Sequence, residues 1–156
     1  MKLGTKGRYG VMAMADLASH SLGDPVTLAV IAERQNISQA YLEQIFVKLR
    51  RAGLVESIRG AAGGYRLGRN ADEITIADIV GAVDEAMEVT RCENAGLEGG
   101  CVNGQRCITH DLWDELERHI TSFLRAVSLG DVVHKRLAGR SAVLRDLAVD
   151  PAMNEV

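Results

Sequence analysis

Three cysteines and one histidine lie close together in a polar stretch of the chain, and they are Cys92, Cys101, Cys107 and His110. The residues between them are mainly glycine, asparagine and charged residues, whereas a cysteine in a core is usually surrounded by apolar residues. Thiolate and imidazole groups are ligands for zinc and for iron–sulfur clusters. Four such donors in one loop therefore predict a metal-binding site, and four incidental side chains are the weaker interpretation.

The spacing of these donors favours a cluster with two iron atoms over a zinc ion. Eight residues separate Cys92 from Cys101, five separate Cys101 from Cys107, and two separate Cys107 from His110. Structural zinc sites usually contain two cysteines about two to four residues apart, and this loop has no such pair. Three cysteines and one histidine supply the four protein ligands of a [2Fe–2S] centre. Replacing one thiolate by a neutral imidazole reduces the negative charge and raises the reduction potential. Protonation of the histidine also competes with iron, which makes the cluster easier to lose and favours a sensor over an electron carrier.

The composition of the 156-residue chain is that of an ordinary globular protein, with 47% hydrophobic, 25% charged and 4% aromatic residues. It contains no apolar run of about 18 residues that could cross a membrane. The first residues lack the apolar segment of a secretion signal, so we expect a cytoplasmic protein. Thiols stay reduced in that compartment, which again favours metal ligation over disulfides.

Charge is divided unevenly along the chain. Residues 1–70 contain ten Lys and Arg against five Asp and Glu, whereas residues 71–156 contain eight against sixteen. A basic first half in a protein of net charge −3 predicts a local site for a polyanion such as DNA.

The basic half has the pattern of a winged helix–turn–helix domain. Two short apolar-faced helices are predicted after Thr27 and Ser38, which are placed as N-caps, and Gly53 is predicted to end the second helix. Two β-prone runs around a glycine-rich tip then predict a hairpin in residues 54–68. The expected fold is mainly α with a small β-hairpin, and its second helix fits the major groove of DNA.

The residues expected to contact DNA are polar or basic and lie in the helix–turn–helix, at the base of the hairpin or near the N-terminus. Gln44 can bond an adenine edge, and Glu43 can accept from cytosine N4 while excluding sites that offer no donor. Arg59 is predicted to enter the minor groove, and the basic residues to meet phosphates. The full set is Lys2, Lys6, Arg8, Ser38, Gln39, Ala40, Tyr41, Glu43, Gln44, Lys48, Arg51 and Arg59.

Helical periodicity also predicts a helix over residues 75–86 and one long helix over residues 109–137. The apolar stripe of the long helix exceeds what a compact winged helix can cover, so we expect it to form a two-fold dimer. The predicted interface is Leu112, Leu116, Ile120, Phe123, Leu124 and Val127. The expected divisions are a DNA-binding domain in residues 1–70, a cluster loop and dimerisation helix in residues 71–137, and a weakly ordered tail in residues 138–156.

Several motifs together resemble the IscR family of winged-helix transcriptional regulators. They include RGAAGGYRL at residues 59–67 and CITHDLW at residues 107–113, and the similarity covers roughly residues 1–135. The resemblance implies a dimeric regulator of iron–sulfur cluster assembly genes, whose [2Fe–2S] cluster reports cluster supply and oxidative stress. It implies that Cys92, Cys101, Cys107 and His110 are the ligands, that Glu43 tunes DNA-site choice, and that cluster donor proteins can be partners.

Two positions depart from that family pattern. The gap between Cys92 and Cys101 is longer than the five residues expected for the branch, which can alter cluster exposure. Ala40 stands where the branch often has serine, which removes one hydroxyl and leaves the preferred DNA sequence open.

Other functions explain the sequence less well. A related regulator that senses nitric oxide or redox state is the alternative, because residues do not specify the signal. An electron-transfer protein would not need a wing or a basic recognition helix. An enzyme is not expected, because the sequence has no nucleophile–base pair, and its glycine-rich tip lacks the Lys-Ser/Thr of a phosphate-binding loop.

Overall fold

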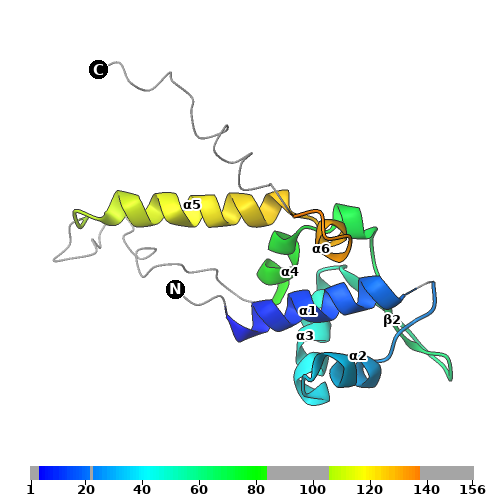
Figure 1. The fold of residues 1–156 in the computed structure, drawn as a ribbon. Coiled ribbons are helices and arrows are strands. Elements are labelled where there is room, and N and C mark those ends of the chain that lie inside the picture. The colour runs from blue at the N-terminus through cyan, green and yellow to red at the C-terminus, as the bar shows by residue number, and fades with distance from the viewer. Residues whose placement is uncertain (1–3, 22, 84–105, 138–156) are drawn as a thin grey trace.

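The computed structural model describes residues 4–21, 23–83 and 106–137, and its first half is a helix–turn–helix followed by a hairpin (Figure 1). The first three helices are α1 (Thr5–His20), α2 (Leu28–Gln35) and α3 (Gln39–Arg51). The hairpin consists of β1 (Val55–Ile58) and β2 (Gly64–Leu67), which pair antiparallel with Val55 opposite Leu67. The predicted fold, mainly helical with a small hairpin, is confirmed.

Local sequence signals determine the ends of α2 and α3. The side chain of Thr27 accepts a hydrogen bond from the backbone N–H of Val30, and Ser38 does the same for Tyr41. The helix–helix turn contains Asn36 in the left-handed conformation, at φ 52°. Gly53, at φ 71°, follows α3 and allows the chain to leave the helix toward β1.

A backbone bridge joins the hairpin to the segment before α2. The N–H of Val26 donates to the carbonyl of Tyr65, the N–H of Tyr65 donates to the carbonyl of Val26, and both distances are 2.8 Å. Glycine is needed beside this bridge, because a Cβ on Gly64 would lie 2.7 Å from the carbonyl carbon and oxygen of Val26. The ring of Tyr65 also packs edge-on against Phe46 of α3, with ring centroids 4.9 Å apart.

The second half adds the 3-10 turn η1 (Ala71–Glu73) and the helices α4 (Ile76–Val83), α5 (His110–Ala126) and α6 (Leu129–Val133). Both α4 and α6 contact α1. One apolar core therefore contains residues from before and after residue 70, including Met14, Phe46, Ile79 and Leu129. The division of function near residue 70 remains a prediction. The predicted tail at 138–156 lies outside the described residues.

The long helix predicted over residues 109–137 is wrong, because the chain leaves the helix at Val127. The N–H of Ile76 donates to the carbonyl of Val127 at 2.9 Å, and the N–H of Leu129 donates to the carbonyl of Ile74 at 2.7 Å. Ser128 then begins α6 with a capping box, in which Ser128 and Asp131 each accept a backbone hydrogen bond from the other. Backbone pairing to the segment before α4 therefore ends α5. The helix predicted over residues 75–86 agrees with α4 in its described part.

Candidate nucleic-acid interface and metal centre

Helix α3 buries one face and leaves the other open. The apolar side chains of the inner face lie in the core, and they are Leu42, Ile45, Phe46 and Leu49. Ile37, just before the N-cap, is also buried, as expected for a hydrophobic staple against Leu42. The residues exposed on α3 include five of the predicted DNA contacts, which are Gln39, Ala40, Glu43, Gln44 and Arg51. The helix therefore presents a polar face of the size and shape that enters a major groove.

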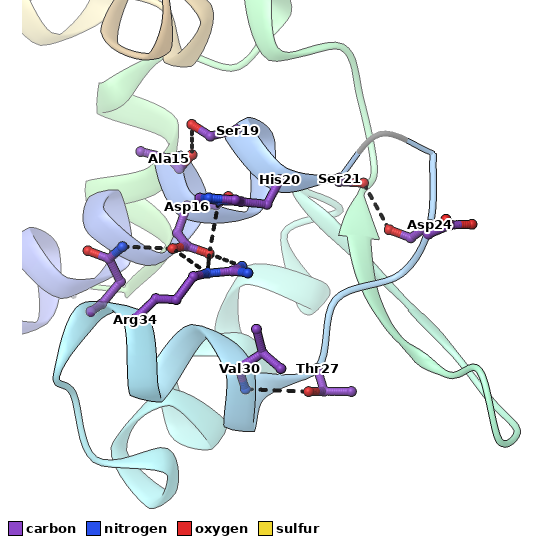
Figure 2. A network of polar contacts seen from close by, with 10 residues as sticks. Ala15, Asp16, Ser19, His20, Ser21, Asp24, Thr27, Val30 and Arg34 are labelled. Atoms are coloured by element: carbon purple, nitrogen blue, oxygen red, sulfur yellow. Dashed lines mark hydrogen bonds and ion pairs between the residues drawn. The ribbon is translucent and has the colours of Figure 1, made fainter.

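A buried carboxylate holds α2 against α1 (Figure 2). The side chain of Asp16 in α1 is fully buried, and Nε of Arg34 in α2 lies 3.1 and 3.0 Å from its two oxygens. Nε2 of Gln35 donates to the same carboxylate at 2.7 Å. The hydrogen bond to Asp16 raises the pKa of the Arg34 guanidinium above its ordinary value. Because α2 precedes the turn to α3, this network helps to fix the position of the helix–turn–helix on α1.

Sequence reasoning missed the Asp16 network, although one signal was present. Asp16 lies between Met14 and Leu17 on the apolar face of α1, where a carboxylate needs a partner when it is buried. The partners come from α2, so periodicity within α1 could not name them.

Four predicted DNA contacts on α3 have interactions within the protein. Nε2 of Gln39 donates to a carboxylate oxygen of Glu43 at 3.2 Å, one helical turn away. The half-buried ring of Tyr41 packs edge-on against Tyr9 of α1, with centroids 5.6 Å apart. The Lys48 ammonium is directed to α4, where it donates to the carbonyl of Val83 at 3.2 Å.

The remaining predicted DNA contacts lie outside α3 in the sequence. Arg59 is exposed and directly follows β1, while Lys6 and Arg8 are exposed in the first turn of α1. Ser38 is exposed and acts as the N-cap of α3, which occupies its hydroxyl as an acceptor. Lys2 lies outside the described residues.

The structure describes two of the four predicted metal ligands, and they lie at the start of α5. The N–H of His110, the first residue of the helix, donates to the carbonyl of Cys107 at 3.0 Å. Sγ of Cys107 lies 3.5 Å from Oγ1 of Thr109, which also accepts a 3.2 Å hydrogen bond from Nε1 of Trp113. Cys92 and Cys101 lie outside the described residues.

Thiolate and imidazole donors of this kind fit iron or zinc, and a helix N-terminus favours the negative charge of a thiolate. Within residues 4–21, 23–83 and 106–137, no three His, Cys, Asp or Glu side chains come together as a metal site. The described part of the chain thus contains one half of the predicted ligand set.

The apolar stripe of α5 changes in exposure along the helix. Leu112 near its start is 62% exposed, Leu116 and Ile120 are half-buried, and Phe123 and Leu124 pack against the core. The placement of Val127 in the predicted dimer interface needs correction. Val127 is only 2% exposed and belongs to the core of its own chain, because the backbone pairing with Ile76 turns it inward.

Comparison with known proteins identifies the family to which the chain belongs. Residues 3–135 match the model of the Rrf2 family, described as an iron-dependent transcriptional regulator. The chain belongs to this family, which consists of transcriptional regulators rather than enzymes.

Individual relatives are more specific. The chain is 54% identical over 133 residues to the HTH-type transcriptional regulator IscR of Aliivibrio salmonicida, covering 85% of this chain and 77% of that protein. It is 51% identical over 144 residues to IscR of Photorhabdus laumondii, covering 90% and 86%. The solved structure of T. potens IscR matches at 38% identity and a TM-score of 0.71, covering 87% of this chain and 88% of that one. CymR, the global cysteine regulator of B. subtilis, matches at 36% identity and a TM-score of 0.68, covering 86% and 98%.

The comparisons thus confirm the predicted family and the predicted role in transcriptional regulation. The description of the family as iron-dependent agrees with the prediction of an iron-related regulator. Among the described helices, none is long and apolar enough to span a membrane.

Proposed function

We propose that the chain is a DNA-binding transcriptional regulator that senses an iron–sulfur cluster and controls cluster assembly genes in the cytoplasm. The observation that carries the proposal is the open polar face of α3, whose apolar face is buried and whose start is capped by Ser38. The exposed hairpin residue Arg59 and the exposed Lys6 and Arg8 of α1 add positive charge to the same half of the chain. Promoter DNA is the partner that fits this combination.

On DNA, α3 lies in the major groove with Gln39, Glu43 and Gln44 at the base edges and Arg51 at the phosphates. The hydrogen bond from Gln39 restrains the side chain of Glu43. A carboxylate held there lowers the affinity for base pairs that offer it no hydrogen-bond donor. The side chain of Ala40 has no polar group that could bond to a base, so discrimination between bases depends on Gln39, Glu43 and Gln44.

The proposed cofactor is a [2Fe–2S] cluster on Cys92, Cys101, Cys107 and His110. Support comes from the donor types, from their wide spacing and from the position of Cys107 and His110 at one helix N-terminus. When bound, the cluster supplies a redox-sensitive and oxygen-sensitive group whose presence reports cluster supply. The residues of this chain hold the cluster, and cluster donor proteins are the partners that deliver it.

The chain is proposed to work as a homodimer through α5. The half-buried Leu116 and Ile120 and the exposed Leu112 form a face that the described part of this chain leaves incompletely covered. A second copy of α5 covers it and places two α3 helices on adjacent half-sites. Cluster binding then shifts the population of dimers toward one DNA-bound geometry.

The test is anaerobic purification of the full chain, with iron, sulfide and zinc counted on one sample. We expect iron and sulfide in equal amounts, and their loss in Cys92→Ala, Cys101→Ala and Cys107→Ala. Binding of promoter fragments is then compared between cluster-loaded and cluster-free protein. One zinc ion per chain without sulfide would reject the cluster, and identical binding of every fragment by both forms would reject sensing.

A further inference from the structure

Backbone pairing holds the C-terminal end of α5 on its own chain. The junction, residues 127–129, lies between α5 and α6. Within it, Ser128 forms an antiparallel bridge with Thr75, and the N–H of Leu129 donates to the carbonyl of Ile74 at 2.7 Å. Figure 1 shows α5 extending from the junction away from the other helices. The direction of α5 is therefore set by the junction and by the packing of α5 against α4.

Helix α6 ends in a turn that brings the chain back toward the junction. The N–H of Lys135 donates to the carbonyl of Val132 at 3.2 Å, and the N–H of Arg136 donates to the carbonyl of Asp131 at 2.8 Å. Lys135 has the left-handed conformation, at φ 56°, so these two bonds form a Schellman motif. The motif places Arg136 beside Asp131, which lies in the first turn of α6.

The guanidinium of Arg136 joins two carboxylates from different parts of the chain. Its Nε donates to Oδ1 of Asp131 at 3.1 Å, and its Nη2 donates to Oδ1 of Asp72 in η1, which is 64 positions away. The side chain of Asp131 is 10% exposed and also accepts the N–H of Ser128 in the junction, at 3.1 Å. Because η1 follows the hairpin, Arg136 connects the end of the winged-helix unit (α1 to β2) to the junction that holds α5.

Gly130 of α6 allows Asp72 to come this close. A Cβ on Gly130 would lie 2.0 Å from Oδ1 of Asp72 and 3.2 Å from Nη2 of Arg136. Gly130 does not have a positive φ, so alanine fits its backbone and would displace mainly the Asp72 side chain. The contact between Asp72 and Arg136 can therefore be broken in two ways, one of which changes no charge.

We propose that Arg136 is a positioning residue that fixes the direction of α5 by joining Asp72 to Asp131, and so sets the half-site spacing that the dimer accepts on DNA. This inference rests on the proposed dimer. Half-sites lie about one helical turn of DNA apart, and the separation of the two α3 helices depends on the direction of each α5. Without the guanidinium, the two carboxylates repel each other, and α5 takes a range of directions.

Arg136 has two rival roles, and each predicts a different result. A phosphate contact contributes equally at every half-site spacing and adds about one unit to the salt slope. A contact that only stabilises the fold changes the free energy of unfolding and leaves the spacing preference alone. A positioning residue changes the ratio of the affinities for different spacings, because a loose connection lowers the effective concentration at the best spacing and tolerates the others.

The experiment compares the full-length wild type with Arg136→Met, Arg136→Lys and Gly130→Ala. The probes are duplexes that carry two copies of the half-site that the wild type selects from a randomised library, with spacers that differ by single base pairs. A duplex with one half-site measures the contacts of a single α3. Kd is measured for each duplex at several salt concentrations.

Arg118→Met is the matched control for the loss of an arginine. Arg118 also pairs with two carboxylates, but both belong to α5 itself, so its loss does not reach the junction. Circular dichroism and sedimentation check that each variant folds and associates as the wild type does. If Arg136→Met folds poorly, Gly130→Ala takes its place, because it keeps every charge.

We expect the wild type to bind about tenfold more weakly when the spacer differs by two base pairs from the selected one, because this change rotates one half-site by roughly 70° around the DNA axis. Arg136→Met and Gly130→Ala should reduce that penalty to about threefold or less. Arg136→Lys should fall between them and the wild type, since an ammonium lacks the planar fork that holds two carboxylates. Arg118→Met should keep the full penalty, and all variants should bind the single half-site equally.

Two results would contradict the proposals, and they differ. If the wild type prefers one spacing, and Arg136→Met and Gly130→Ala keep the same preference, the inference alone is overturned. Equal weakening of Arg136→Met on every duplex, with a lower salt slope, would then make Arg136 a phosphate contact. A monomeric wild type with no spacing preference would overturn the proposed dimer, and the inference would fall with it.

Discussion

Helices α3 and α5 are both amphipathic, but their apolar faces have different surroundings. The apolar side chains on the inner face of α3 are almost fully buried, and the ring of Phe46 packs against the hairpin ring of Tyr65. Those of α5 become more exposed toward its start, where Leu112 is 62% exposed. In Figure 1 that end of α5 extends away from the other helices. The apolar face of α3 is covered by its own chain, and we propose that the apolar face of α5 is covered by a second copy of the chain.

The ion pairs of the helix–turn–helix unit and of α5 differ in the same way. Arg34, which binds Asp16 next to the helix–turn–helix, joins two helices through a carboxylate that is fully buried. Arg118 of α5 pairs with Asp114 and Glu115 of its own helix, and all three side chains are more than half exposed. The ion pair of Arg34 therefore holds two helices together. The ion pairs of Arg118 lie within α5 and on its solvent-exposed surface.

The largest expected effect is on the buried face of α3. Phe46→Ala should lower the free energy of unfolding by about 3–5 kcal/mol, because it leaves a cavity between α3 and the hairpin. The matched change Leu112→Ala on α5 should lower it by less than about 1 kcal/mol in dilute protein, because that side chain is mainly exposed. Urea unfolding of both variants measures the difference. Equal losses would mean that α5 is packed as tightly as α3.

The next effect concerns the ion pairs. Arg34→Met should cost about 3 kcal/mol of stability, because the buried carboxylate of Asp16 would keep Gln35 but lose its cationic partner. Arg118→Met should cost no more than about 1 kcal/mol, as is usual for exposed pairs.

Thermal and urea unfolding at neutral pH give both values for the ion-pair variants. Adding Asp16→Asn to Arg34→Met should recover part of the loss, because the unpaired charge is removed. No recovery in the double variant would show that packing of the arginine stem, rather than charge, holds α2 on α1.

The remaining effect is on association rather than on the stability of the single chain. Leu116→Glu should weaken the proposed dimer by about 1.5–3 kcal/mol for each buried copy of the leucine, because the face of α5 would lose apolar area. Ser122→Glu, at an exposed position on the opposite face of α5, should leave association unchanged. Sedimentation equilibrium over a range of protein concentrations measures both variants. A wild type that stays monomeric at all concentrations would remove the dimer from the proposal.

The elements that sequence predicted best depend on local contacts. The caps Thr27 and Ser38, the helix end at Gly53 and the hairpin depend on hydrogen bonds or backbone angles within a few residues, which the sequence displays directly. The exposed face of α3 follows from its period of 3.6 once its apolar face is known.

The features that sequence missed depend on contacts between distant segments. Val127 continues the apolar stripe of α5 in sequence, but its carbonyl bonds to Ile76, more than forty residues away. A local signal did exist, since Ser128 and Asp131 have the spacing of a capping box. Lys48 also fits an outward position by period, and only the position of α4 shows where its ammonium goes.

The bridge between Val26 and Tyr65 has a consequence for how operators can change. The paired main-chain hydrogen bonds tie the hairpin to the segment that enters α2, and Gly64 lets the two backbones approach. In the proposed DNA complex, these backbone hydrogen bonds, together with the packing of Tyr65 on Phe46, set the distance between α3 in the major groove and Arg59 at the neighbouring minor groove. Substitutions on the exposed face of α3 are then expected to change which bases are read, while the spacing between the two points read on the duplex stays constant.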